Sequence, residues 1–185
     1  EAKFEALKTK LKQAEEYIFL EYFIIEKGVM WNEILDILKE KVWQGVDVRV
    51  LYDGMCSLQA LPYHYDKELR RAGIKCKQFS PIRPVISSYQ NNRDHRKICV
   101  IDGKVGFTGG VNLADEYINV NSPYGIWKDN GVLLKGKCVD SLVYLFIELY
   151  NLAGIKFLNS EDYLYKNHKE YKDAGKKRNA LLREY

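Results

Sequence analysis

Residues 96–108 of the 185-residue chain read Arg-Lys-Ile-Cys-Val-Ile-Asp-Gly-Lys-Val-Gly-Phe-Thr. Apolar residues flank the pair Asp102-Gly103, and Asp-Gly is a favoured central pair of a type I′ turn because both residue types tolerate positive φ. This stretch therefore predicts an antiparallel hairpin, with one strand over 96–101 and its partner over 104–108. Any further strands must join a sheet that already contains this pair.

Upstream of the hairpin, strand-like and helix-like patterns alternate along the chain. The strand-like segments are short and rich in apolar, aromatic or β-branched residues, and they cover 17–25, 46–52 and 74–79. The segments with helical spacing of apolar residues cover 1–16, 31–43 and 63–72. Strands separated by helices predict right-handed crossovers and a mostly parallel sheet.

Downstream of the hairpin, residues 127–134 have the pattern of a strand and 137–152 that of an amphipathic helix. The whole pattern predicts an α/β fold, a mixed sheet flanked by helices on both faces. We expect residues 1–158 to form this domain. Residues 159–185 are highly charged and lack a clear hydrophobic face over most of their length, so we expect a charged, partly helical linker there.

Composition limits the classes of protein that fit. Apolar residues make up 46% of the chain and charged residues 29%, as in a globular domain and unlike a disordered or collagen-like chain. The net charge of +4 tolerates an anionic substrate but is too small to predict nucleic-acid binding. No apolar run reaches the roughly 18 residues of a membrane span. The four cysteines form no C-x-x-C pair, which favours free thiols in a reducing compartment.

His95, Lys97 and Asp102 form the pattern H-x-K-x-x-x-x-D within the hairpin. Residues two apart on a strand point to the same face, so His95 and Lys97 are predicted to stand side by side. A neutral imidazole beside a fixed ammonium group suits attack on a phosphodiester, because the ammonium neutralises the phosphoryl oxygens while a ring nitrogen adds to phosphorus. Asp102 either supports catalysis or serves only the turn, and strand alternation places it off the His95–Lys97 face.

Gly109-Gly110-Val111-Asn112 follows the hairpin and precedes an acidic turn. Glycines permit close backbone approach to a bound group, and Asn112 is a good N-cap for a short helix whose amides face an anion. We therefore predict that Gly110 and Asn112 bind phosphate at the same end of the sheet as His95. No metal or cofactor is expected.

Two acids at the ends of predicted strands allow more than one interpretation. Glu21 interrupts an apolar strand, where a buried acid is costly unless it is paired, so it either lines the substrate site or lies at the exposed strand end. We favour the substrate site for Glu21. Asp53 precedes Gly54 and is either a turn residue or part of the site.

Residues 95–117 closely resemble the first catalytic motif of the phospholipase D superfamily, and within it most of all the bacterial cardiolipin synthases. Weaker matches to the family begin at Phe19, Val50 and Ile126, and they come in the family's order along the chain. With them, the resemblance covers roughly residues 14–152. The resemblance implies one lobe of a phospholipase D-like fold. It also implies metal-independent chemistry through a phosphohistidine, which transfers a phosphatidyl group to an alcohol. In cardiolipin synthases, donor and acceptor are both phosphatidylglycerol, and glycerol leaves.

The resemblance also implies a role for each matching residue. His95 is the nucleophile or its general-acid counterpart, Lys97 and Asn112 bind phosphate, and Asp102 stabilises the motif. Asp129 matches a downstream acid that orients an active-site histidine, either its own or that of a partner motif.

The family builds its site from two such motifs, whereas this chain has one, because His64 and His168 lack a lysine two residues on. The chain also begins inside a helical pattern. We therefore expect a fragment, inactive or nearly so alone, that supplies half of the site of a larger two-motif enzyme.

The expected partners follow from this half-site. They are a phosphatidylglycerol-like phospholipid, a second lobe of the parent chain or a second copy, and the bacterial cytoplasmic membrane surface through the parent; the fragment itself would be soluble, and no nucleic acid is expected. One alternative is a single-motif homodimeric phosphodiesterase or endonuclease of the same superfamily. The other is a non-catalytic lipid- or anion-binding module.

Overall fold

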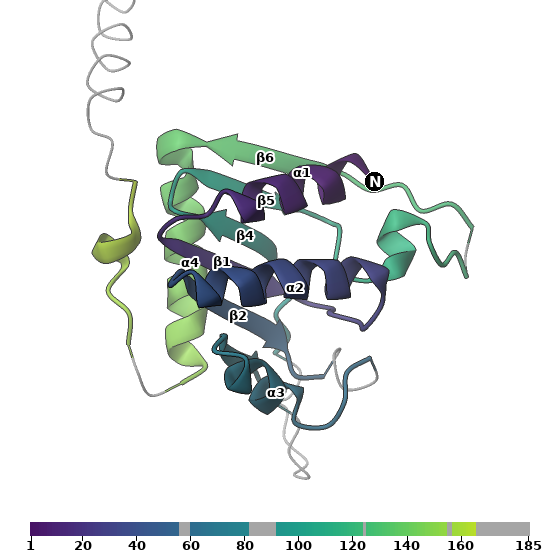
Figure 1. Cartoon of the computed structure of the whole chain (residues 1–185), viewed down its shortest axis with the longest axis horizontal. Coiled ribbons are helices and arrows are strands. Elements are labelled where there is room, and N and C mark those ends of the chain that lie inside the picture. Colours follow the sequence, from purple (N-terminus) through teal and green to yellow (C-terminus); the bar gives the residue numbers. More distant parts are fainter. Residues whose placement is uncertain (56–59, 82–91, 124, 155–156, 166–185) are drawn as a thin grey trace, which may run out of the picture.

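Six strands form one sheet in the computed structural model, which describes residues 1–55, 60–81, 92–123, 125–154 and 157–165. The order of the strands across the sheet is β3-β2-β1-β4-β5-β6 (Figure 1). Their bounds are β1 (Tyr17–Tyr22), β2 (Asp47–Asp53), β3 (Lys75–Phe79), β4 (Lys97–Ile101), β5 (Val105–Gly109) and β6 (Gly131–Lys135). β1 and β4 are therefore the central pair.

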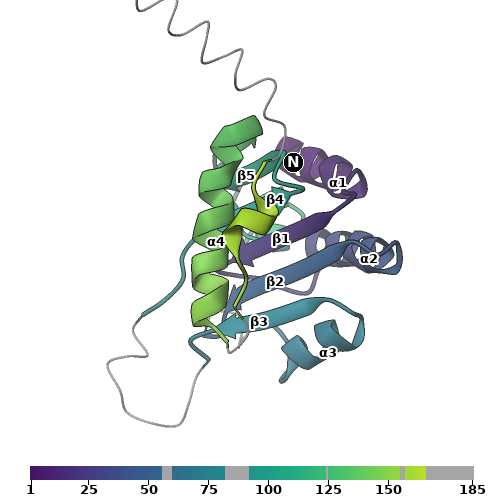
Figure 2. The ribbon, with the colours of Figure 1, turned by 90° about the vertical axis from the view of Figure 1, so that its left-hand side faces the viewer.

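Helices cover both faces of this sheet. On one face lie α1 (Ala2–Lys12), α2 (Val29–Trp43) and α3 (Tyr65–Arg71), and on the other lies α4 (Asp140–Leu152) (Figure 2). Short 3-10 segments are η2 (Asp115–Ile118), η3 (Gly136–Val139) and η4 (Ser160–Tyr163). This is the α/β architecture, a mixed sheet between two helical layers, that the sequence predicted.

The directions of the strands correct one expectation. β1 and β2 pair in parallel, as do β2 and β3. The pairs β1–β4, β4–β5 and β5–β6 are antiparallel. The prediction of a mostly parallel sheet is therefore wrong beyond β3. The crossover rule applies only to strands separated by helices, and the tight turn between β4 and β5 forces those two strands to run in opposite directions.

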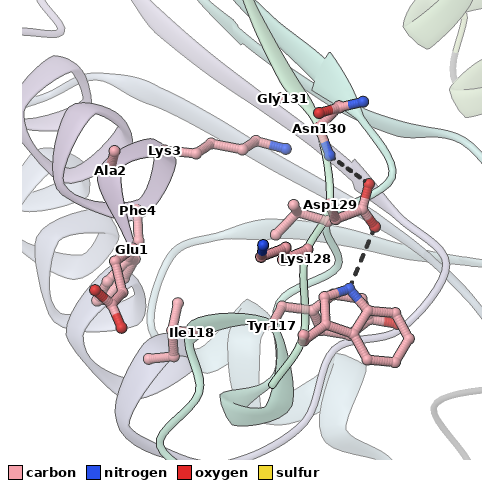
Figure 3. Close-up of a pocket in the computed structure, with 12 residues that line it drawn as sticks. Glu1, Ala2, Lys3, Phe4, Tyr117, Ile118, Lys128, Asp129, Asn130 and Gly131 are labelled. Carbon is pink, nitrogen blue, oxygen red and sulfur yellow. Dashed lines mark hydrogen bonds between the residues drawn. The ribbon is translucent and has the colours of Figure 1, made fainter. Parts of the chain in front are cut away.

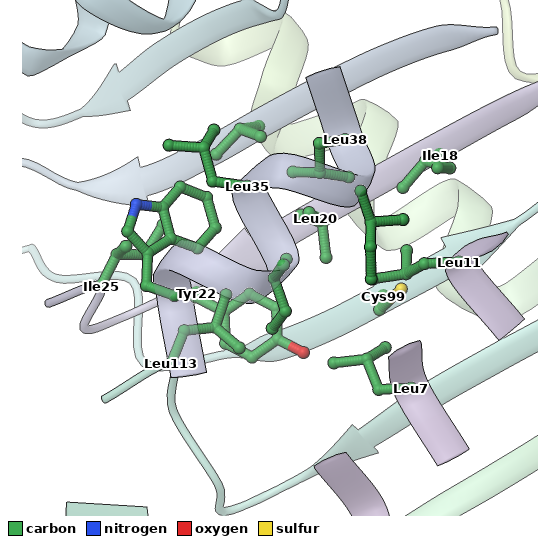
Figure 4. Packing of buried hydrophobic residues seen from close by; sticks show 14 of the residues in the cluster. Leu7, Leu11, Ile18, Leu20, Tyr22, Ile25, Leu35, Leu38, Cys99 and Leu113 are labelled. Carbon is green, nitrogen blue, oxygen red and sulfur yellow. The ribbon is translucent and has the colours of Figure 1, made fainter. Parts of the chain in front are cut away.

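β1 is buried on both of its faces. Ile18 and Leu20 pack against α1 and α2 (Figure 4), whereas Phe19 packs on the opposite side of the sheet. There the Phe19 ring stacks on Phe146 of α4, with ring centroids 4.4 Å apart. A central strand without a solvent face explains why the sequence of β1 is an almost continuous apolar run rather than an alternating one.

The ends of some elements differ from the sequence prediction. The strand predicted over 17–25 ends at Tyr22, and the strand predicted over 127–134 begins at Gly131. At the predicted start of the linker, Tyr163 packs on the α4 side of the sheet, its ring 5.0 Å from that of Phe19. The rest of the predicted linker, residues 166–185, lies outside the described residues.

Two further sequence observations can be compared with the structure. Cys76, Cys99 and Cys138 are free thiols, and Cys99 is buried as its apolar surroundings predicted, whereas Cys56 lies outside the described residues. Within the described part of the chain, none of the helices combines the length and the apolar character that crossing a bilayer would demand.

The hairpin turn has the predicted conformation. Asp102 and Gly103 have φ values of +52° and +63°, as a type I′ turn requires. The Lys104 amide closes the turn by donating to the Ile101 carbonyl at 3.0 Å. An L-residue other than Asn or Asp would be strained at the first of these positions.

The Asp102 side chain reaches beyond its own turn. Its Oδ1 accepts hydrogen bonds from the amides of Glu16 and Tyr17, both at 2.8 Å, and its Oδ2 accepts one from the Glu15 amide at 3.0 Å. The Asp102 amide in turn donates to the Tyr17 carbonyl at 3.0 Å. A single buried carboxylate thus fastens the β4–β5 turn to the start of β1.

We expect Asp102→Asn to lower the free energy of unfolding by about 2–4 kcal/mol, because an amide group offers one acceptor oxygen where the carboxylate offers two charged ones. Asparagine keeps the tolerance for positive φ, so the substitution isolates the carboxylate. Urea unfolding followed by circular dichroism measures the change. Asp36→Asn, on the exposed face of α2, is the matched control, and equal stability of the two variants would contradict this role.

Candidate functional site

Several strand ends meet at one edge of the sheet. The parallel strands β1 and β2 end there, the antiparallel strand β4 begins there, β5 ends there and β6 begins there. At or next to this edge the structure gathers most of the residues that the sequence singled out, namely Glu21, Asp53, His95, Lys97, Gly110, Asn112 and Asp129. Asp102 lies at the opposite edge.

The structure brings His95 and Lys97 together at the start of β4. Lys97 is 4% exposed, whereas His95, two residues earlier, is exposed. The Lys97 Nζ lies 3.2 Å from His95 Nδ1 and donates to the His95 carbonyl oxygen at 2.7 Å. Phe23 completes the group, since its ring centroid is 4.5 Å from that of His95 and 5.0 Å from the Lys97 Nζ.

The Lys97 ammonium approaches the histidine ring on its Nδ1 side. Nε2, the other ring nitrogen, therefore faces away from Lys97. His95 also lines a cavity of about 340 Å³ that the end of α4 closes on one side.

Glu21 lies behind this pair, on the other face of the sheet, and its carboxylate is fully buried. The Arg96 Nε lies 2.5 Å from one Glu21 oxygen and 3.5 Å from Asp94 Oδ1. Burial, reinforced by the neighbouring Asp94 carboxylate, raises the pKa of Glu21 to about 8, although Arg96 opposes the shift. Burial also raises the pKa of Asp94.

Asp53, at the end of β2, holds the segment that leads into β4. Its buried carboxylate accepts hydrogen bonds from the Asp94 amide at 3.0 Å and from the Met55 amide at 2.9 Å. It also pairs with Arg93, whose Nη1 lies 3.2 Å from Asp53 Oδ1. Asp53, Arg93 and Asp94 therefore fix the backbone immediately before His95, which answers the question that the sequence left open for Asp53.

Asn112 positions the loop that carries Phe23. Its Oδ1 accepts a hydrogen bond from the Ile24 amide at 3.1 Å, and its Nδ2 donates to the Tyr117 hydroxyl at 2.8 Å. Asn112 is not the N-cap that the sequence suggested, because η2 begins three residues later and its N-cap is Ala114. What it supports is the backbone next to Phe23 and therefore the packing of Phe23 on His95.

Gly110 is adjacent to Asp129 rather than to an open phosphate cradle. A Cβ atom at Gly110 would lie 2.3 Å from Asp129 Oδ1, so only glycine lets this carboxylate approach the end of β5. Asp129 itself is exposed, and its Oδ2 accepts a hydrogen bond from the Trp127 indole at 3.4 Å. The Asn130 amide donates to its Oδ1 at 2.6 Å.

A family model described as a cardiolipin synthase, PLD-like domain, matches residues 7–135, which run from α1 to the end of β6. The chain belongs to this family. The PLD-like domain is 54% identical over 154 residues to an uncharacterized protein of Streptococcus mutans, which covers 83% of this chain and 33% of the relative. It is 42% identical over 166 residues to a cardiolipin synthase of Geobacillus kaustophilus, with 89% and 33% covered. The PLD-like domain thus spans about a third of the length of these curated relatives.

The fold of the PLD-like domain is also similar to that of a solved structure. Nuc of Salmonella typhimurium, a phospholipase D family member, superposes with a TM-score of 0.54 at 16% identity. The match covers 83% of this chain and 90% of that one. At this level of identity the comparison shows the shared fold, one lobe of the phospholipase D type.

Asp102, the third residue of the motif, lies far from the other two. β4 runs from Lys97 to Ile101, and at about 3.4 Å per residue the strand places Asp102 well over 10 Å from the His95–Lys97 pair. Its carboxylate is occupied by the three amides before and at the start of β1. In the PLD-like domain, Asp102 therefore acts on the fold and not on the reacting atoms, which is the structural role that strand alternation favoured.

Sequence reasoning missed several residues that shape this site. Asp94 and Arg96 flank His95 and partner Glu21, and Phe23 packs on the His95 ring. Arg93 and Arg96 are likewise paired with buried acids. One available signal was the need of Glu21, an acid in an apolar strand, for a nearby cation; nothing local indicated Phe23.

Replacing Glu21 should change how the stability of the PLD-like domain depends on pH. Because the folded pKa is about 8 and the ordinary value is 4.5, the folded state retains the proton where the unfolded state loses it. The stability from neutral Glu21 is complete below pH 4.5 and is lost as pH rises toward 8, and Asp94 shifts in the same direction. Glu21→Gln stays neutral, so its unfolding free energy relative to wild type should rise by roughly 2–4 kcal/mol between pH 5 and pH 8.

Urea unfolding at the two pH values measures this difference. Glu26→Gln, at an exposed position in the loop after β1, is the control, for which the difference from wild type should stay constant. A pH-independent difference for Glu21→Gln would mean that Arg96 keeps Glu21 ionised throughout.

Proposed function

We propose that the PLD-like domain provides half of the active site of an enzyme that transfers phosphatidyl groups between phospholipids, with cardiolipin formed from two phosphatidylglycerol molecules. The observation that carries this proposal is the buried Lys97 ammonium, held 3.2 Å from Nδ1 of an exposed histidine. A fixed cation beside an accessible imidazole supports phosphoryl transfer. The cation stabilises charge on the phosphoryl oxygens, while the imidazole either transfers a proton or forms a bond to phosphorus. The similarity to cardiolipin synthases favours a phospholipid as the substrate.

The reaction requires two histidines. In the first step, one histidine nitrogen bonds to phosphorus, the bond from phosphorus to the glycerol oxygen breaks, and the second histidine gives its proton to that oxygen. In the second step, the acceptor hydroxyl bonds to phosphorus, the phosphorus–nitrogen bond breaks, and the hydroxyl proton returns to the second histidine. His95 is one of the two. The other would come from a second lobe of the parent protein or from a second copy of this chain.

His95 is either the nucleophile or the general acid of the first step. As the nucleophile it would attack phosphorus through the Nε2 lone pair, and as the acid it would act as the imidazolium, which gives up one proton and returns to the neutral ring. The histidine of the second motif would take the other role. Asp129, at the same edge, is available to orient that partner histidine or to bind a substrate hydroxyl, and Asn112 and Gly110 support the surrounding loops.

The proposed organisation of the parent follows from the same reasoning. Residues 1–158 would be the first catalytic lobe, and residues 159–185, whose described part packs on this domain through Tyr163 and Leu164, would be the link to a second one. The parent would act at the bacterial cytoplasmic membrane, where its lipid substrates are. The fold shared with Nuc, of which the match covers 90%, is also compatible with the alternative of two identical copies that pair their motifs.

His95→Asn should lower phosphatidyl transfer by about 10²–10⁴-fold in the full-length protein, the usual contribution of a general acid or base. Cardiolipin formation in phosphatidylglycerol vesicles is the measurement. His64→Asn is the matched control, because His64 is exposed, lies away from the site and has a φ of +61° that asparagine tolerates. Unchanged activity in His95→Asn would leave the non-catalytic binding module as the better explanation.

The 185-residue chain alone should give little or no product when monomeric. Activity that grows with the square of protein concentration would indicate paired copies, and robust turnover by the monomer would contradict the half-site. In the full-length protein, rapid quenching and peptide mass spectrometry should find the phosphatidyl group on one of the two motif histidines, and the labelled peptide identifies the nucleophile. A phosphatidyl group on neither histidine would contradict the covalent mechanism.

A further inference from the structure

A second pocket opens at the same sheet edge, between the first turn of α1 and the segment that leads into β6 (Figure 3). Its volume is about 760 Å³. Its walls include apolar and aromatic side chains from three parts of the chain, among them Phe4, Val111, Ile118, Tyr117 and Trp127. Charged groups also line it: Glu1, Lys3, Lys128 and Asp129. An apolar wall with a few charged groups is the usual lining of a site for a small amphiphilic molecule.

Lys3 is the unusual residue of this pocket. Its side chain extends from α1 toward Asn130 (Figure 3) and lies so close to Gly131 that a Cβ there would be 2.5 Å from Lys3 Cδ. The Nζ is buried and has no hydrogen-bond partner among the residues that the structure describes. Burial accordingly lowers the pKa of Lys3, while Asp129 attracts the ammonium without reaching ion-pair distance.

A buried ammonium without a hydrogen-bonded partner is unfavourable, because it has lost its hydration and gained little in return. An anion in the pocket would supply the missing acceptor. Asp129 on the same wall disfavours a small, fully charged anion and favours a molecule that also offers a hydroxyl donor to the carboxylate. A glycerophosphate group has both features, a phosphate oxygen for Lys3 and a hydroxyl for Asp129.

We propose that this pocket is the acceptor subsite, in which Lys3 binds the phosphate of the lipid whose glycerol hydroxyl receives the phosphatidyl group. The inference rests on the proposed function, because it assumes a donor phosphate at His95 and Lys97. Asp129 connects the two places, since its carboxylate packs against Gly110 at the end of β5 and also lines the pocket. Lys128, exposed at the rim, adds positive charge for an anionic lipid, and the aromatic wall accommodates the glycerol carbons.

The test separates acceptor binding from donor cleavage in the full-length protein. Exchange of labelled glycerol into phosphatidylglycerol requires donor cleavage and an alcohol, but no second phosphate. We expect Lys3→Met to lower cardiolipin formation roughly ten-fold or more. The decrease should come from a higher KM for the lipid acceptor, because the substitution removes one charge-assisted hydrogen bond. Glycerol exchange should stay within about two-fold of wild type, since Lys97 still binds the donor.

The outcomes distinguish this inference from the proposed function. If wild type shows neither cardiolipin formation nor glycerol exchange, the proposed function fails. If wild type is active and Lys3→Met lowers both reactions equally, or neither, the acceptor subsite is wrong. Lys12→Met, an exposed lysine at the other end of α1, is the matched control and should leave both reactions unchanged.

Two measurements on the chain itself guard against misfolding and identify the ligand. The midpoint temperature of thermal unfolding of Lys3→Met should be equal to or higher than that of wild type, because methionine removes a buried charge. A clear decrease in this temperature would make Lys3 a structural residue. Glycerophosphoglycerol, the deacylated headgroup, should shift the Trp127 indole N–H signal in NMR spectra of wild type but not of Lys3→Met. Inorganic phosphate binding as tightly as glycerophosphoglycerol would make the pocket a simple phosphate site and overturn the acceptor assignment.

Discussion

The antiparallel register between β1 and β4 is the constraint on which the site depends. It places Tyr22 opposite Lys97 and Glu21 opposite Ile98. A shift of β4 by one residue would turn Lys97 to the α4 face, the face on which Glu21 lies, since successive strand residues point to opposite faces. At the far edge, the Asp102 carboxylate binds the amides before and at the start of β1 and so holds this register. The position of the His95–Lys97 pair is thus secured from the opposite end of β4.

Buried acids behind His95 form a second layer of support. Asp53 and Glu21, at the ends of neighbouring parallel strands, each contact one arginine of the segment 93–96. Such contacts contribute little net stability, because desolvation offsets much of their attraction, but the loss of one partner leaves the other buried and unsatisfied, which is costly. Only the conformation of the segment 93–96 that satisfies both acids is therefore favoured. That conformation delivers His95 to the exposed side while its neighbours face inward.

The sequence predicted what depends on local interactions. The Asp102-Gly103 turn, the alternation of strands and helices and the proximity of His95 to Lys97 all follow from residues close together in the chain. Roles that depend on distant partners were not accessible. Asn112 was expected to cap the next helix, yet it binds Ile24, 88 residues away, and the partners of Asp102 lie 85–87 residues away. The buried state of Lys3 likewise needs α1 and β6 to be brought together, which no local pattern encodes.

The position of Asp102 explains why four residues separate the lysine from the aspartate in H-x-K-x-x-x-x-D. Those four intervening residues make up the rest of β4 after Lys97. The spacing therefore corresponds to the length of this strand, from the end that carries His95 and Lys97 to the end that carries Asp102. A strand one residue shorter or longer would leave the aspartate facing the wrong way or out of reach of β1. The interval between Lys97 and Asp102 therefore reflects the length of β4, a requirement of the fold that does not depend on the substrate.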